Sequence, residues 1–285
     1  MTPHRSLLFL PADNPRALTK AKTLPADACI LDLEDAVAPE HKDAARTAAV
    51  AAIQAGGFGD KQVAVRINGL HTAIAESDIE ALLITPPHAI VVPKAEQADD
   101  LTALGDLLDA ASVPNHVGLW IMAETPTGVL NARALCAAHW RIQALLLGTS
   151  DLSQALRLPP DPQRLGLQTA LGLCVLAARE ANIDVIDGVS LTIGADAEFE
   201  AVCRQGRQLG FDGKTLIHPS QIEIANRIFR PTEAEVDAAR RVLAAWERAR
   251  EHGQGICVLD GRLIESLHIT DAERTVTLAE ACAGR

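Results

Sequence analysis

The chain has 285 residues, of which 48% are hydrophobic and 22% charged, so it can build a sizeable core and is neither disordered nor fibrous. With 26 basic and 37 acidic residues, a net charge of -11 and 3% aromatic residues, it lacks the basic, aromatic surface that nucleic-acid binding usually needs. The length fits roughly two domains or one α/β barrel. A net negative charge repels anions, so the composition does not explain how the protein would bind an anionic metabolite.

The N-terminal segment Met1–Pro11 contains one short apolar run that ends at a proline and lacks the cleavage pattern of a signal peptide. No segment approaches the ~18 apolar residues of a membrane span. We therefore expect a soluble, cytoplasmic protein without a membrane partner. The six cysteines are scattered singly and without zinc-ligand spacing, which indicates core positions.

Eight short aliphatic runs recur along the chain and predict strands. They are Ser6–Leu10, Ala28–Leu33, Val63–Ile67, Ala89–Pro93, Gly118–Ala123, Ile142–Leu147, Asp184–Val189 and Gly213–His218. Segments with helical periodicity follow them, some behind a proline or a capping residue. These are Pro15–Leu24, His41–Gln54, Ala73–Leu83, Gln97–Ala111, Gly128–Ala138, Gln163–Ala181, Ala195–Leu209 and Ser220–Phe229.

Eightfold alternation of strand and helix favours a closed (β/α)₈ TIM barrel over an open doubly wound sheet. No Gly-x-Gly-x-x-Gly follows the first strand, so a dinucleotide-binding sheet loses its main support. We assign residues 1–230 to the barrel. Residues 231–285 form a C-terminal appendage, with a helix from Glu233 to about Arg250, an extended piece at Ile256–Leu259 and a helix from Asp271. It would cover the barrel mouth or lie at a subunit interface.

Charged residues gather where the predicted strands end, the part of such barrels that carries the chemistry. Glu124 and Asp151 follow neighbouring strands and are the best candidates for ligands of Mg²⁺, which one or two carboxylates usually hold. Alternatively, each carboxylate caps the next helix or pairs with a cation.

Arg66 could grip a carboxylate or stabilise an oxyanion, or it could simply pair with Glu34 or Asp35. The segment Asp32–Asp35 holds three acids, of which one could take part in metal or water binding while the others orient Arg66 or Lys94.

Lys94 could form a Schiff base, although nearby acids favour an electrostatic role. His218 could act as a base or be structural. Arg5 and Lys214 lie at the entering ends of their strands, so we leave them out of the site.

Together these residues resemble the citrate lyase beta subunit and malyl-CoA lyase family, within the HpcH/HpaI aldolase/citrate lyase superfamily of phosphoenolpyruvate/pyruvate-type barrels. The resemblance covers almost the whole chain in order. The matching segments are Arg5–Pro11, Asn14–Arg16, Asp32–Val37, Val65–Asn68, Pro93–Glu96, Glu124–Pro126, Gly148–Leu152, Gly213–Lys214 and Ile217–Gln221.

The resemblance implies a Mg²⁺-dependent carbon-carbon lyase that cleaves a 3-hydroxyacyl thioester such as malyl-CoA or citryl-CoA, or runs the reverse condensation. The products would be an acetyl thioester and a 2-oxo acid of the oxaloacetate or glyoxylate class. By position, Glu124 and Asp151 hold the metal, and Arg66, with Glu124 and Lys94, contacts the substrate. Asp35 joins Arg66 among the candidate catalytic residues.

The family also places coenzyme A phosphates near the first helix, where this chain offers Arg16, Lys20 and Lys22. Its members carry a tail aspartate that reaches a neighbouring subunit's site as a proton donor or acceptor. Here Glu265 replaces that aspartate and the proline that follows it is missing. The longer glutamate can do the same proton chemistry.

Two other functions stay open. A site that makes the enolate but admits water would be an acyl-CoA thioesterase, and a non-catalytic beta-like subunit would serve a larger assembly. The sequence does not distinguish a coenzyme A thioester from an acyl-carrier-protein thioester. The family suggests a homotrimer or a multiple of it.

Overall fold

The computed structural model describes residues 2–194, 197–253 and 255–283. The chain forms two compact units, one running from His4 to Asn226 and the other made mainly of the residues from Arg227 onward. Among the described residues, no helix is both long and apolar enough to cross a lipid bilayer. The predicted boundary at residues 230 and 231 stays a prediction.

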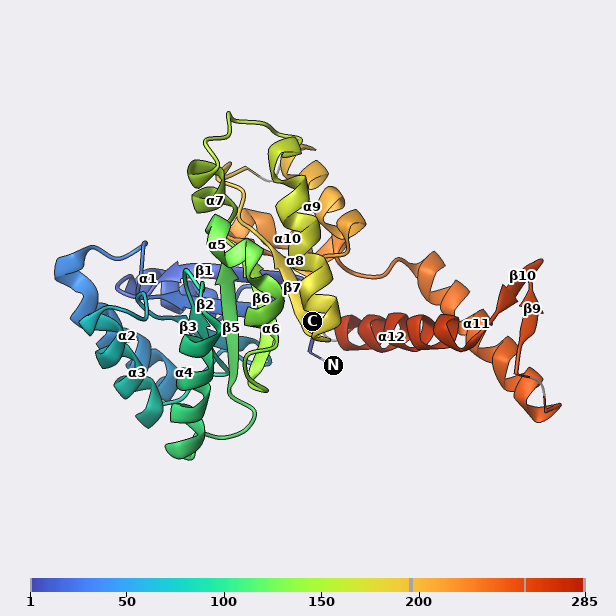
Figure 1. The fold of residues 1–285 in the computed structure, drawn as a ribbon, viewed down its shortest axis with the longest axis horizontal. Coiled ribbons are helices and arrows are strands. Elements are labelled where there is room, and N and C mark those ends of the chain that lie inside the picture. Colours follow the sequence, from blue (N-terminus) through green and yellow to red (C-terminus); the bar gives the residue numbers. More distant parts are fainter. Residues whose placement is uncertain (1, 195–196, 254, 284–285) are drawn as a thin grey trace. The chain divides into compact units, whose positions relative to one another are not determined.

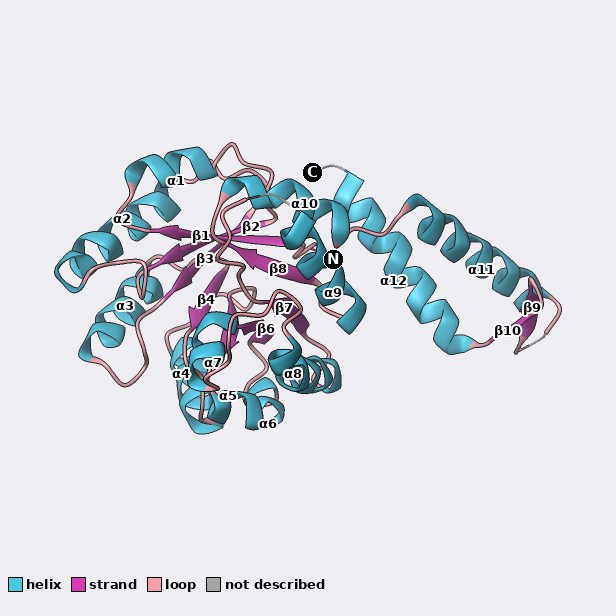
Figure 2. Ribbon diagram, turned by 90° about the horizontal axis from the view of Figure 1, so that it is seen from above, coloured by secondary structure: helices cyan, strands magenta, loops and turns pink. Residues whose placement is uncertain are grey.

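The first unit is a closed barrel of eight parallel strands in sequence order, as predicted (Figures 1 and 2). The strands are β1 (Ser6–Pro11), β2 (Ala28–Asp32), β3 (Gln62–Arg66), β4 (Ala89–Val92), β5 (Gly118–Ala123), β6 (Ile142–Leu147), β7 (Asp184–Asp187) and β8 (Gly213–Leu216). Pairing of β8 with β1 closes the ring. Because both strand faces are covered, the strands are mostly apolar throughout.

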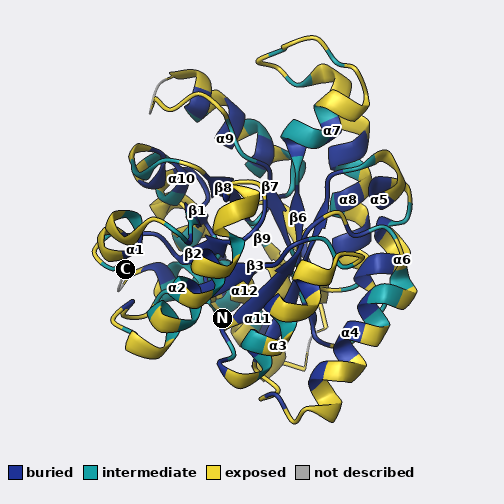
Figure 3. Cartoon of the chain, turned by 90° about the vertical axis from the view of Figure 1, so that its left-hand side faces the viewer, coloured by how far each residue is buried: buried dark blue, intermediate teal, exposed yellow. Residues whose placement is uncertain are grey.

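Helices surround the barrel and expose their outer faces (Figure 3). They are α1 (Pro15–Ala21), α2 (Lys42–Ala55), α3 (Ala73–Ile84), α4 (Ala98–Ala110), α5 (Pro126–Leu130), α6 (Ala132–Cys136), α7 (Thr149–Ala155), α8 (Gln168–Glu180), α9 (Ala197–Leu209) and α10 (Ile222–Ile228), with short 3₁₀ turns at η1 (Pro39–His41), η2 (Leu165–Leu167) and η3 (Pro219–Gln221). The sequence did not predict α7, and the helix expected at Gly128–Ala138 is split into α5 and α6. The start of the helix expected from Ala195 lies outside the described residues.

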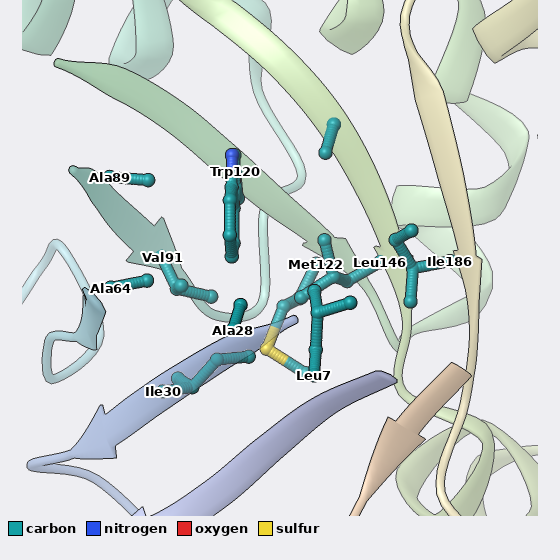
Figure 4. Packing of buried hydrophobic residues seen from close by; sticks show 11 residues of the cluster. Leu7, Ala28, Ile30, Ala64, Ala89, Val91, Trp120, Met122, Leu146 and Ile186 are labelled. Carbon is teal, nitrogen blue, oxygen red and sulfur yellow. The ribbon is translucent and has the colours of Figure 1, made fainter. Parts of the chain in front are cut away.

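The barrel interior is packed with side chains from alternate strand positions (Figure 4). Trp120 is 1% exposed, and the same cluster contains the small residues Ala28, Ala64, Ala89 and Ala144. Small side chains leave space for the indole inside a ring of eight strands. The interior is therefore a solid core, and the chemistry must lie at one end of it.

Five of the six cysteines are buried, as the sequence indicated, and Cys257 is partly exposed. Burial raises the pKa of Cys29 to about 11 and the pKa of Cys136, Cys174 and Cys203 to about 12. Their thiols stay protonated at neutral pH and pack as small apolar groups.

The second unit contains α11 (Glu233–Glu251), an antiparallel hairpin of β9 (Cys257–Leu259) and β10 (Arg262–Ile264), and α12 (Ser266–Ala283). Thr232 and Glu235 form a reciprocal cap at the start of α11. Strand β9 lies within the predicted extended piece, but the sequence did not predict β10, which folds back onto β9 after a turn at Asp260 and Gly261, both with positive φ. The last helix also starts at Ser266 instead of Asp271.

Candidate active site

Seven charged side chains from five neighbouring segments meet at the C-terminal ends of the strands. We call them the mouth cluster: Asp32, Glu34, Asp35, Arg66, Lys94, Glu124 and Asp151. They gather because parallel strands in a closed barrel end at the same rim. Five of them are acids and two are bases, so the cluster is acidic as a whole.

Arg66 is held in place by Asp32. The two residues face each other in the register of β2 and β3, and the guanidinium donates from Nε and Nη2 to the two carboxylate oxygens of Asp32 at 2.7 and 2.6 Å. The ring of Phe9 lies 4.9 Å from the guanidinium carbon. Burial lowers the pKa of Arg66, but Asp32 outweighs that effect and raises it. Arg66 therefore stays charged, with Nη1 directed at Glu34, 3.0 Å from its Oε2.

Asp32 also shapes the turn that carries two other acids. Its Oδ1 accepts a hydrogen bond from the backbone N–H of Glu34 at 2.9 Å, and its Oδ2 accepts one from Ala36 at 3.0 Å. With one carboxylate bonded to both the turn and Arg66, Asp32 has an orienting role. It has little capacity left for a metal or a water molecule.

Lys94 connects the other members of the cluster. Its ammonium pairs with Glu34 and lies 3.7 Å from Asp35 and 4.0 Å from Asp151. Burial lowers the pKa of Lys94, but the hydrogen bond and charge of Glu34 outweigh burial and raise it. A Schiff-base role needs a neutral amine, so this geometry favours the electrostatic alternative. Lys94 also has a φ of 47°, in the left-handed region that side chains rarely adopt.

Glu124 is 3% exposed at the end of β5. Its Oε1 accepts a hydrogen bond from the backbone N–H of Lys94 at 2.6 Å, the one hydrogen bond that Glu124 makes among the described residues. Burial first, and the nearby charge of Glu34, raise the pKa of Glu124 to about 7. A buried carboxylate with a free oxygen is poised to bind a cation or a proton.

Asp151 lies in the first turn of α7, and its side chain is 40% exposed. Gly148, directly before α7, packs against Glu124 so closely that an added Cβ would lie 2.4 Å from Glu124 Oε2. The missing side chain at Gly148 leaves room for the carboxylate of Glu124 itself. No group of three or more His, Cys, Asp or Glu side chains could hold a metal within the described part of the chain. Two carboxylates fit Mg²⁺, which usually completes its coordination with water or substrate oxygens, and they do not fit a zinc site.

The structure does not bring every predicted residue to this cluster. Arg16 lies in the first turn of α1, but Lys20 is in its last turn and Lys22 is its C-cap, with Nζ 5.3 Å from the ring centre of Phe58. These side chains are spread along the helix. Glu265 belongs to the second unit, where its backbone N–H donates to His268 Nδ1 at 3.1 Å.

Two other candidates have structural roles. His218 accepts a hydrogen bond from the backbone N–H of Ser220 at 3.2 Å and caps the turn η3, which favours its structural alternative. Arg5 forms a buried pair with Asp27 at the opposite end of the barrel, as expected for an entering-end residue.

Sequence reasoning missed two supports of the cluster. Phe9 lies at an apolar strand position that gives no sign of its contact with a cation. Helix α7, which presents Asp151, has only seven residues and no clear apolar periodicity.

Comparisons with known proteins agree with this geometry. A (3S)-malyl-CoA thioesterase of Cereibacter sphaeroides is 45% identical over 281 residues, covering 99% of this chain and 96% of the relative. An L-malyl-CoA/beta-methylmalyl-CoA lyase of the same species is 32% identical, covering 98% of this chain and 95% of the relative. The solved structure of CitE from Mycobacterium tuberculosis, in complex with magnesium, acetoacetate and coenzyme A, is 30% identical with a TM-score of 0.76 and covers 98% of each chain.

A family model also matches residues 5–219, which contain the whole mouth cluster. The chain therefore belongs to the HpcH/HpaI aldolase/citrate lyase family.

Proposed function

We propose that the protein is a Mg²⁺-dependent lyase that cleaves the carbon-carbon bond of a malyl-type or citryl-type thioester, or forms it in reverse. The observation that carries this proposal is the composition of the mouth cluster. Five carboxylates surround two cations, and one oxygen of the buried Glu124 is unused. Glu124 and Asp151 would hold a divalent cation here, and its charge would offset the excess negative charge that opposes an anionic substrate.

Glu124 and Asp151 would hold Mg²⁺, which supplies positive charge beside the oxygens of the oxo acid. Arg66 would stabilise the substrate oxygen as its charge develops, through the Nη1 group, which does not bond to Asp32 and lies 3.0 Å from Glu34 Oε2. Since Asp32 fixes the guanidinium plane, little reorganisation is needed when that charge appears. Lys94 would add a second positive charge from the opposite side of Glu34.

The lyase reaction needs a proton acceptor and a proton donor. The acceptor removes the proton of the 3-hydroxyl group, the carbon-carbon bond breaks as the carbonyl forms, and the bonding electrons become the enolate of the acetyl thioester. A donor then protonates the enolate carbon. We assign these steps to Asp35, whose side chain is 58% exposed at the mouth, and to Glu265 supplied by a neighbouring subunit.

Arg16, Lys20 and Lys22 would attract the phosphates of coenzyme A, the ligand that the magnesium-bound CitE structure contains. Because these cations spread along α1, they suit an extended phosphate chain better than a single anion. The acyl-carrier-protein alternative stays open. The homotrimer and the cytoplasmic location stay predictions.

Hydrolysis of a malyl thioester is the second candidate. The specific observation in its favour is that the 45% identical relative is a thioesterase, whereas the lyase relative is 32% identical. The same carboxylates and Arg66 would serve both reactions, which differ in whether water attacks the thioester. A purely structural beta-like subunit is less consistent with a cluster that keeps an unused buried carboxylate oxygen.

A product assay separates these functions. We would incubate the purified protein and Mg²⁺ with malyl-CoA, methylmalyl-CoA and citryl-CoA, and follow acetyl-CoA, free CoA and the oxo acid separately. A lyase yields acetyl-CoA with oxo acid. A thioesterase yields free CoA with intact hydroxy acid, and a structural subunit yields neither pair.

The same assay tests the metal ligands. Glu124→Ala and Asp151→Ala should each lower kcat/KM at least about 100-fold. The matched control is Asp43→Ala, which removes an exposed carboxylate from α2 and should leave kcat/KM unchanged. Unchanged activity in both cluster variants would show that the metal site has been misassigned.

A further inference from the structure

Three charged side chains form a buried group beside the mouth cluster. Asp187 at the end of β7 and Lys214 in β8 are both 0% exposed, and their charged atoms are 2.8 Å apart. Arg164, in the segment between α7 and α8, donates from Nη1 to both oxygens of Asp187 at 2.7 and 2.9 Å. We call these residues the buried triad. Burying three charges is costly, so each must be paired well for the fold to tolerate it.

The register of the barrel explains why Lys214 reaches this place. Lys214 is the second residue of β8, a position that the sequence assigns to the entering end. In the structure it is paired with Asp187, the last residue of β7. Strands in a closed barrel are staggered, so the start of one can lie level with the end of its neighbour. Lys214 therefore lies at the start of β8, as the sequence indicated, and pairs with Ser6 at the start of β1, while its side chain reaches Asp187 at the end of β7.

The triad fixes the backbone that follows β7. Lys214 Nζ donates to the carbonyl of Gly188, and Asp187 Oδ1 accepts from the N–H of Gly188 at 2.8 Å. Thr149, the first residue of α7, donates from its hydroxyl to the carbonyl of Val189 at 3.2 Å. An added Cβ on Gly188 would lie 2.4 Å from that hydroxyl, so the two segments touch directly.

This contact leads to both proposed metal ligands. Asp151 is two residues beyond Thr149 in the same helix. Gly148, one residue before Thr149, packs against the side chain of Glu124. A shift of the backbone after β7 would move the start of α7 and change the position of both carboxylates.

Arg164 ties a second segment to the same place. It has a φ of 54°, and its Nε donates to Gln205 in α9 at 2.8 Å. Arg164 and Thr149 both line a cavity of about 630 Å³, together with Val189 and Ser190 after β7. The triad thus connects α7 to the two segments that line this cavity, the one after β7 and the one that contains Arg164.

We propose that Arg164, Asp187 and Lys214 are positioning residues that hold α7, and with it Asp151 and Glu124, in the arrangement that binds the metal. This inference rests on the proposed function. The triad reaches the metal ligands through Gly188, Thr149 and Gly148. Partners behind metal ligands typically change metal affinity 10- to 100-fold when they are replaced.

The test measures the binding of Mn²⁺ to the purified full-length protein by electron paramagnetic resonance, without substrate. Lys214→Met and Arg164→Gln should each weaken Mn²⁺ binding by about tenfold or more. Arg164→Lys keeps the charge and should recover part of the loss. Thr149→Val removes the hydroxyl link and keeps the side-chain volume, so it tests the same path without disturbing a buried charge.

The matched control is Arg5→Met, which breaks an equally buried ion pair at the other end of the barrel. It should lower the melting temperature as much as Lys214→Met does and leave Mn²⁺ affinity within about twofold. Equal Mn²⁺ affinity in wild type, Arg164→Gln and Thr149→Val would overturn the positioning role while the proposed function stands. If wild-type protein bound no Mn²⁺, the metal-dependent function and this inference would both be wrong.

Discussion

The two ends of the barrel differ in how their charged side chains are paired. At the mouth, five carboxylates face two cations, and the buried Glu34 Oε2 has an ion pair with Arg66 Nη1 at 3.0 Å but accepts no hydrogen bond among the described residues. At the bottom, the buried arginines Arg5 and Arg141 each pair with an aspartate. Arg5 donates three hydrogen bonds to Asp27, counting that from its own backbone N–H.

The bottom end contains two further matched groups. Arg141 pairs with Asp109 and donates to the carbonyls of Val113, Pro114 and Val117. His4 bonds to Asp184 at 2.5 Å and to Gln62 at 2.6 Å.

The comparison teaches that burial alone does not identify a functional group. Buried charges occur at both ends, but among the described residues the mouth cluster has more acids than bases, and its buried Glu124 makes a single hydrogen bond. A buried carboxylate with few partners costs stability, so its retention among other charged groups indicates a functional role.

The largest contrast should come from the same substitution at both ends. Arg66→Lys and Arg5→Lys each retain a positive charge and lose the planar fork that binds a carboxylate. Arg66→Lys should lower kcat/KM by about 10²- to 10³-fold, because it loses a donor aimed at the developing oxyanion. Arg5→Lys should lower the melting temperature and leave kcat/KM within about twofold.

Steady-state kinetics and thermal unfolding on the same preparations measure both effects. If Arg5→Lys lost as much activity as Arg66→Lys, the distinction between a functional mouth and a structural bottom end would be wrong.

Two glycines give a smaller contrast. A Cβ added at Gly148 would lie 2.2 Å from the Cβ of Glu124, whereas one added at Gly213 would lie 1.7 Å from the backbone oxygen of His4. Gly148→Ala should displace Glu124 and lower kcat by more than about tenfold. Gly213→Ala should destabilise the fold by about 1–3 kcal/mol, since backbone must move to relieve the overlap.

Urea unfolding and kcat measurements distinguish the two glycine variants. A Gly148→Ala enzyme with full activity would mean that the position of Glu124 does not matter.

The smallest effect concerns pH. Burial lowers the pKa of His4, but the hydrogen bond and charge of Asp184 outweigh burial and raise it above its ordinary value. The resulting stability is fully present below about pH 6.5 and is lost as pH rises through the folded-state pKa. Wild type should therefore lose stability relative to His4→Gln between pH 6 and pH 9, measured by urea unfolding. A constant difference across this range would exclude a charged His4.

The fold was largely predictable from the sequence. All eight strands lie where the aliphatic runs predicted them, because strands covered on both faces must be apolar. The elements that the sequence did not predict are short or depend on the conformation of a turn. Helix α7 has too few residues to show periodicity, and the extra strand β10 follows a turn at Asp260 and Gly261.

The sequence predicted where the site lies in the barrel, but it did not predict which side chains of the site pair with each other. Counting residues to the strand ends was enough to bring Arg66, Glu124 and Asp151 to one rim. The pairing of Arg66 with Asp32 could not be read from the sequence, since side-chain direction at a strand end depends on the neighbouring strand. The contact between Lys214 and Asp187 depends on the stagger of the barrel strands, which a local sequence pattern does not indicate.

The buried cysteines make this protein convenient for thiol chemistry. Because Cys29, Cys136, Cys174 and Cys203 are buried with raised pKa, a thiol-reactive dye should detect released coenzyme A above a low background from the folded protein. Cys257, partly exposed in β9, is the natural place to attach a spin label or a fluorophore. A probe there would report directly whether the hairpin that precedes Glu265 approaches the barrel mouth of another subunit during turnover.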